Sequence, residues 1–117
     1  EFGTMAYGTA LGVTESLNYL LSIGIHKIAA HNRCIADQLI TGLTELGAEI
    51  LSPRLASERS ATVAVRFPGK KSQDVAKDLK RNSIIASLRG DFIRFSPHLY
   101  NNTADINQAL YAIKETC

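Results

Sequence analysis

The sequence has 117 residues, of which 45% are apolar and 21% are charged, and its formal net charge is +2. This length predicts one domain spanning residues 1–117 with its own core, and the composition excludes an intrinsically disordered chain. The small charge with scattered cations, and the lack of an uninterrupted apolar run of spanning length, predict neither a nucleic-acid partner nor a membrane partner.

Two helices are predicted at the start of the chain. Residues 7–22 carry apolar side chains with small or polar residues between most of them, which predicts a helix packed on more than one side and ended by Gly24. In residues 25–46, isoleucine and leucine recur mostly at three- and four-residue steps. This spacing predicts an amphipathic helix with Gly47 as its C-terminal cap.

Strands and two further helices follow. Residues 48–51 predict a short strand, and residues 62–67 alternate so that Val63, Val65 and Phe67 share one face. Ser72 is expected to cap a helix that runs to about residue 81. Residues 84–88 and 92–95 predict two strands joined as a hairpin through Gly90-Asp91. A last helix is predicted to begin near residue 102 or 103.

This order predicts an α+β fold: a two-layer sandwich in which a mainly antiparallel four-stranded sheet is covered by helices on one face. The other face of the sheet is then expected to be solvated or pressed against another domain. Where such a domain would dock, we expect an exposed apolar patch.

One stretch, residues 92–102, suggests chemistry. Successive side chains of a strand face opposite ways, so Ile93 and Phe95 share the core face and Arg94 lies on the other. A guanidinium at a strand end suits two-point capture of a carboxylate or phosphate, although a plain surface arginine fits the same spacing.

No complete catalytic set is evident. The sequence has no glycine-rich phosphate loop and no carboxylate pair on a common element that fits an acid/base couple, and its three histidines fall on different elements or faces. Cys34 and His31 are spaced for one helix face, but a zinc site needs further ligands, so we expect no metal and a buried Cys34. Two cysteines form no disulfide framework, and no signal peptide is visible, which favours a reducing, cytoplasmic setting.

The run Arg94-Phe95-Ser96-Pro97-His98-Leu99-Tyr100-Asn101 resembles the C-terminal motif of the class V aminotransferase family. These are fold type I enzymes that depend on pyridoxal phosphate, and they include cysteine desulfurases, lyases and an epimerase branch. Glu1-Phe2-Gly3-Thr4 resembles the segment that introduces the small domain of that family. The resemblance covers essentially the whole chain in the same order of elements.

The resemblance implies roles for particular residues. Arg94 matches the arginine that binds the α-carboxylate of the substrate, and Arg89 lies near the substrate loop. Thr4, with Gly3 beside it, matches a segment that reaches the cofactor phosphate of the neighbouring subunit in a homodimer. Asn101 is expected to fix the loop and cap the last helix.

The cofactor lysine and the partners of the pyridine ring would belong to a large domain that this chain does not contain. The resemblance therefore implies the C-terminal small domain of a longer aminotransferase-like enzyme, acting on an amino acid or keto acid and inactive alone. The connection 89–91 carries no cysteine, which argues against desulfuration. A lyase or epimerase of the same family, or a stand-alone module that binds anions or a partner protein, remains the alternative.

Overall fold

In residues 6–116, the part of the chain that the computed structural model describes, helices and strands follow one another in the predicted order. The first four elements are α1 (Tyr7–Ile23), α2 (Ile25–Glu45), β1 (Glu49–Ile50) and β2 (Val63–Arg66). They are followed by α3 (Ser72–Arg81), β3 (Ser87–Arg89), β4 (Phe92–Phe95) and α4 (Thr103–Thr116).

The four strands form one sheet in the order β1-β2-β4-β3, and every neighbouring pair is antiparallel. Val63 lies opposite Phe95, and Val65 lies opposite Ile93, so the two central strands present their apolar side chains to the same face. These four side chains are buried, as the alternation in the sequence predicted. The α+β sandwich expected from the sequence is therefore confirmed.

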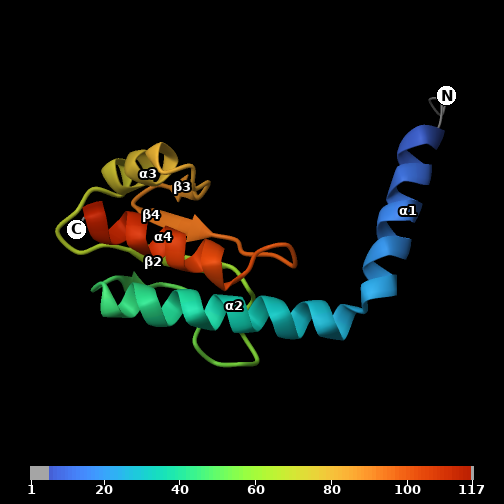
Figure 1. Ribbon diagram of the computed structural model, residues 1–117, viewed down its shortest axis with the longest axis horizontal. Coiled ribbons are helices and arrows are strands. Elements are labelled where there is room, and N and C mark those ends of the chain that lie inside the picture. Colours follow the sequence, from blue (N-terminus) through green and yellow to red (C-terminus); the bar gives the residue numbers. More distant parts are fainter. Residues whose placement is uncertain (1–5, 117) are drawn as a thin grey trace.

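Helices α2, α3 and α4 cover this apolar face, with α4 packed between α2 and α3 (Figure 1). The core is made of aliphatic side chains and two phenylalanines from the three helices and the two central strands. Its largest fully buried members are Leu39, Leu43, Val63, Val65, Val75, Leu79, Ile93 and Ile113. Burying each such side chain stabilises the fold by about 1.5–3 kcal/mol, which explains why the sheet is covered on this face.

Helix α1 differs from the prediction, because none of its residues is buried and it extends away from the sandwich (Figure 1). Leu11, Leu17 and Tyr19 are each more than half exposed. Exposed apolar side chains thus lie along α1, and the expectation that a further domain docks on such a patch stays a prediction. None of the helices within residues 6–116 is long and apolar enough to cross a membrane.

The predicted third strand begins three residues later than expected, at Ser87. The reason is the end of α3, where the backbone N–H of Ile84 donates to the carbonyl oxygen of Leu79 at 2.9 Å. This bond belongs to a Schellman motif, in which the left-handed position is taken by Ser83 at φ 61°. The backbone at Ile84 therefore closes a helix and is not available for strand pairing.

The prediction that Ser72 caps α3 is also wrong. The cap position is Lys71, and Ser72 is the first residue of the helix. Ser72 is only 3% exposed, and its hydroxyl donates to the carbonyl oxygen of Asp91 at 2.6 Å. The serine thus joins α3 to the turn of the β3–β4 hairpin.

Candidate functional site

The uncovered face of the sheet carries Arg94, as the alternation of β4 predicted. Arg94 lies opposite Ala64 of β2 on one side and Ser87 of β3 on the other. Its side chain is half-buried, and its Nε atom is buried with no hydrogen-bond partner in the described part of the chain. A guanidinium in this position has neutral neighbours and offers its donors to the open face.

Arg66 lies on the same face and has a different environment. One terminal nitrogen lies 3.3 Å from the carboxylate of Glu49, and the other lies 2.7 Å from the carboxylate of Asp91. The two acids come from β1 and from the hairpin turn, so three separate segments build this ion-pair network. Arg66 is therefore neutralised inside the domain, whereas Arg94 forms no ion pair with any residue in the range 6–116.

Arg89 is the third arginine of this face. It lies opposite Phe92 at the closed end of the hairpin and is exposed. Gly90, at φ 58°, occupies the first position of the two-residue turn, where a positive φ favours glycine. Among the described residues, Arg89 also has no carboxylate partner.

The loop after Arg94 is held by Asn101. Its side-chain oxygen accepts the backbone N–H of His98 at 3.0 Å, and its side-chain nitrogen donates to Asp105 at 3.2 Å. Its own backbone N–H donates to the carbonyl oxygen of His98 at 2.9 Å. The rings of His98 and Tyr100 lie 5.4 Å apart on the outside of this loop. The expected loop-fixing role of Asn101 follows from these contacts.

The start of α4 is capped by the next residue, Asn102. Its side-chain oxygen accepts the backbone N–H groups of Ala104 and Asp105, at 2.8 and 3.2 Å. The carboxylate of Asp105 in turn accepts the backbone N–H of Asn102 at 3.0 Å, which completes a reciprocal capping box. Asn101 therefore supports the cap through Asp105, and Asn102 provides it.

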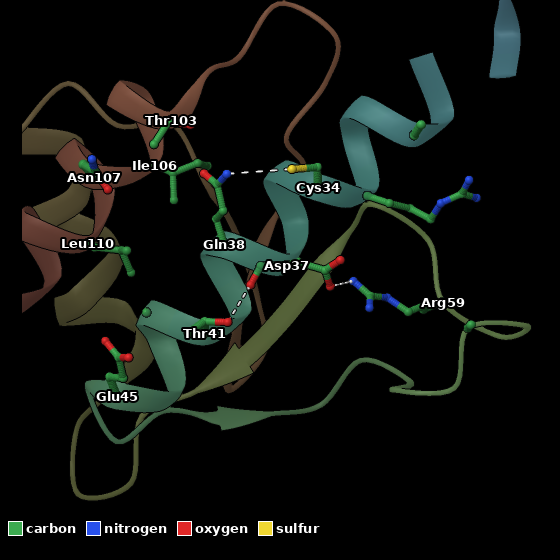
Figure 2. Close-up of a pocket in the computed structure, with 14 residues that line it drawn as sticks. Cys34, Asp37, Gln38, Thr41, Glu45, Arg59, Thr103, Ile106, Asn107 and Leu110 are labelled. Carbon is green, nitrogen blue, oxygen red and sulfur yellow. Dashed lines mark hydrogen bonds and ion pairs between the residues drawn. The ribbon is translucent and has the colours of Figure 1, made fainter. Parts of the chain in front are cut away.

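A separate hollow of about 880 Å³ lies between α2, α4 and the segment before β2 (Figure 2). Its walls include Cys34 and Gln38 on α2 and Asn107 and Leu110 on α4. This hollow lies on the helical side of the sandwich and contains neither Arg94 nor Arg89. It therefore forms no part of the open-face site.

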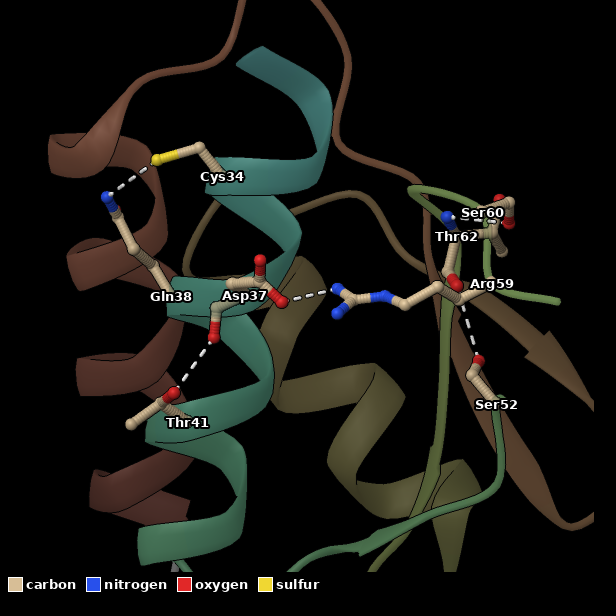
Figure 3. Close-up of polar contacts among 8 residues, drawn as sticks. All are labelled: Cys34, Asp37, Gln38, Thr41, Ser52, Arg59, Ser60 and Thr62. Carbon is tan, nitrogen blue, oxygen red and sulfur yellow. Dashed lines mark hydrogen bonds and ion pairs between the residues drawn. The ribbon is translucent and has the colours of Figure 1, made fainter. Parts of the chain in front are cut away.

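The hollow corrects the expectation that Cys34 is buried. The thiol is free and exposed, and the side-chain nitrogen of Gln38 lies 3.8 Å from it. Figure 3 shows Gln38 next to Asp37, whose carboxylate is directed the other way and is paired with Arg59. The buried stripe of α2 runs instead through Ile35, Ala36, Leu39, Ile40 and Leu43. Cys34 falls on the flank of that stripe, where none of the elements within residues 6–116 covers it.

Two of the candidate residues lie outside the described part of the chain. These are Gly3 and Thr4, for which the structure says nothing about the expected contact with a cofactor phosphate.

The pairing of Cys34 with His31 in a metal site is not supported, since the described residues contain no cluster of three or more metal-ligating side chains. Nε2 of His31 lies 2.9 Å from the carbonyl oxygen of Asn101 instead.

Comparison with known sequences points to one family. The family described as Aminotransferase class-V matches residues 1–108. An uncharacterized aminotransferase of Schizosaccharomyces pombe is 32% identical over 107 residues, which cover 92% of this chain and 26% of that protein. A probable cysteine desulfurase of Pyrococcus abyssi is 26% identical, over 98% of this chain and 32% of that protein. The chain thus spans about a quarter to a third of these relatives.

Solved structures agree with this assignment. The apo structure of a cysteine desulfurase from Thermococcus onnurineus NA1 superposes with a TM-score of 0.92 at 25% identity, covering 99% of this chain and 32% of that protein. A NifS-like protein superposes with a TM-score of 0.88 at 22% identity and shows the same fold. The shared architecture therefore includes nearly every residue of this chain and about a third of each larger structure.

Proposed function

The chain belongs to the class V aminotransferase family, and we propose that it is the C-terminal small domain of a longer pyridoxal-phosphate-dependent enzyme. In this proposal the enzyme transfers an amino group between an amino acid and a keto acid. The small domain contributes Arg94, which binds the α-carboxylate of the substrate. By itself the domain is expected to be inactive, because the lysine that attaches the cofactor would lie in the large domain.

The charge state of the open sheet face carries the proposal. Arg66 is balanced by two carboxylates, whereas Arg94 is half-buried and has no counter-charge among the described residues. The Nε atoms of both arginines are buried without a partner, so the missing counter-charge is what distinguishes Arg94. A buried guanidinium without a counter-charge is costly, and a carboxylate satisfies it through two parallel hydrogen bonds. Arg94 thus supports an anion-binding role better than a structural one.

The cofactor itself is proposed to be held elsewhere. Pyridoxal phosphate supplies an electron sink for the bonds at the α-carbon of a bound amino acid. Among the described residues, Arg94 is proposed as the clamp for the substrate carboxylate. We assign phosphate contacts to Thr4 and Gly3, which would act across the subunit interface of a homodimer. That assignment concerns residues outside the described range.

Helix α1 supports the presence of a large domain. Its exposed apolar side chains have no partner in residues 6–116, and the chain spans only 26% and 32% of the relatives that it matches. We propose that the remaining part of a longer polypeptide packs on α1. Covering the helix there would remove its leucine, valine and tyrosine side chains from water.

Transamination is proposed in preference to desulfuration, although some relatives are named as probable cysteine desulfurases. A desulfurase needs a nucleophilic cysteine beside the substrate, and the hairpin turn next to Arg89 has none. The exposed thiol of Cys34 belongs to α2, which covers the opposite face of the sheet from Arg94. A thiol on that side does not face the proposed carboxylate site.

Steady-state kinetics of the full-length enzyme test the proposal. A charge-assisted bidentate contact is worth about 1.5–3 kcal/mol, so Arg94→Ala should lower kcat/KM by about tenfold to a hundredfold. Arg94→Lys keeps the charge but loses the planar fork, and it should recover only part of the loss. Arg81→Ala, which removes an exposed arginine on α3, serves as the control. Unchanged kinetics for Arg94→Ala would remove this residue from the substrate site.

A further inference from the structure

The two arginines without a counter-charge are neighbours on the open face. Arg94 lies opposite Ser87, and Arg89 lies opposite Phe92. Side chains that lie directly opposite in an antiparallel pair share a face, so all four residues point to the same side. Arg94 and Arg89 occupy diagonal positions, for which the separation is typically about 7–8 Å. Two guanidinium groups on long side chains therefore reach into one common space.

The acids of this face do not neutralise this pair. Glu49 and Asp91 both contact Arg66, at 3.3 and 2.7 Å, and no other ion pair within residues 6–116 involves the open face. Asp91 lies within the hairpin turn that follows Arg89, yet its carboxylate is paired with Arg66. Two unbalanced positive charges at this spacing repel one another, and a ligand with two negative charges relieves that repulsion.

The residues between the arginines are neutral. Ser87 and Phe92 occupy the other diagonal of the same four-residue group, and Ala64 lies on the far side of Arg94. Phe92 is half-buried and presents apolar surface between the two cations. The surface thus offers two anion-binding groups separated by a short apolar stretch.

We propose that the substrate is an amino acid with a second acidic group. This inference rests on the proposed function. Arg94 binds the α-carboxylate, and Arg89 binds the acidic group at the end of the substrate side chain. The aliphatic part of the substrate then lies over Phe92. Arg89 is exposed, whereas Arg94 is half-buried, so the invariant carboxylate enters the deeper position and the distal acid stays at the rim. Arg89 is thereby the specificity-determining residue.

The test compares each amino diacid with its neutral amide, which has nearly the same shape. The full-length enzyme is assayed with glutamate against glutamine and with aspartate against asparagine. We expect Arg89→Gln to lower kcat/KM for the better diacid by about tenfold or more, which is the loss of one charge-assisted contact, and to lower kcat/KM for the amide much less, so that the ratio of diacid to amide falls. Arg89→Lys should retain an intermediate preference. Thermal unfolding of each variant checks that the fold is intact.

The two proposals fail in different ways. If Arg94→Ala loses activity with both the diacid and its amide, the role of Arg94 as the carboxylate clamp is supported. If Arg94→Ala keeps its activity, the proposed function is overturned. The ratio of diacid to amide reports on Arg89 alone. An Arg89→Gln enzyme with an unchanged ratio, or a wild-type enzyme that turns over neutral amino acids but no diacid, overturns the further inference while Arg94 keeps its role.

Discussion

Nε2 of His31 lies 2.9 Å from the backbone carbonyl oxygen of Asn101, a residue 70 positions later in the sequence. Because a carbonyl oxygen only accepts hydrogen bonds, this ring nitrogen carries the proton. The contact connects α2 to the loop that follows Arg94. Together with the side-chain bonds of Asn101, it fixes the position of that loop.

Removing the side chain of Asn101 should loosen the loop. Asn101→Ala deletes the bonds to the N–H of His98 and to Asp105, so we expect the free energy of unfolding to fall by about 1–3 kcal/mol. Urea unfolding followed by circular dichroism measures the change. His31→Ala removes a single bond at an exposed site and should cost less. Equal stability of the Asn101 variant and the wild type would contradict the role given to this network.

Replacing Ser83 by glycine should stabilise the domain. Ser83 holds a left-handed conformation at φ 61°, which costs a residue with a Cβ atom about 1–2 kcal/mol relative to glycine, partly offset by the greater flexibility of glycine in the unfolded chain. We expect a net gain of about 0.5–1 kcal/mol in thermal unfolding. Gly47→Ala, at φ 78° in the equivalent position after α2, provides the opposite control and should lose stability. A Ser83→Gly variant that is less stable would mean that the serine side chain contributes more than its backbone strain.

Gly42 should tolerate no larger side chain, because α2 and α4 approach closely there. A Cβ atom on Gly42 would lie 2.2 and 2.8 Å from the two methyl carbons of Leu110. Gly42→Ala is therefore expected to lose about 1–3 kcal/mol through overpacking, of which the higher helix propensity of alanine offsets about 0.5–1 kcal/mol. Gly12→Ala is the matched control, since nothing lies within 4 Å of that position in α1.

Shortening the opposing side chain should relieve the clash at Gly42. The double variant Gly42→Ala/Leu110→Ala is expected to lose less stability than the sum of the losses in the two single variants, as measured by a double-mutant cycle. A Gly42→Ala variant as stable as the wild type would show that Leu110 moves aside without loss.

The exposed apolar surface of α1 should cause the 117-residue chain to self-associate. Leu11 and Leu17 are 69% and 53% exposed, and exposed apolar side chains on a helix favour association in water. Sedimentation velocity over a range of concentrations should show a rising average mass, which Leu11→Glu/Leu17→Glu lowers. Leu55→Glu removes an equally exposed leucine from a loop and serves as the control. A monomer at all concentrations would contradict the prediction.

Several features of the site follow from local patterns alone. The alternation at Val63, Val65, Ile93 and Phe95 predicted the buried face of both central strands, and with it the open position of Arg94. The hairpin between β3 and β4 followed from Gly90-Asp91. The loop-fixing role expected of Asn101 agrees with its contacts. The roles of Arg94 and Arg89 toward a substrate stay predictions.

Other features depended on contacts between distant segments. Cys34 follows the helical pattern of α2, but its exposure was decided by where α4 and the segment before β2 lie. Likewise, Ser72 has the composition of a cap, yet its hydroxyl binds the carbonyl oxygen of Asp91. Sequence spacing predicted neither, because it describes the faces of an element and does not say which neighbour covers each face.

The sequence by itself determined the order of the elements, the core face of the sheet and the side on which Arg94 lies, because backbone geometry fixes the two-residue period of strands and the 3.6-residue period of helices. Only the tertiary structure decided which cations remain unbalanced. Arg66 and Arg94 each alternate with buried apolar residues of a strand, so both have the same kind of position in the sequence, but Glu49 and Asp91 reach only Arg66. Charge neutralisation acts over a few ångströms in space, and the strand register together with the hairpin turn sets which side chains come that close.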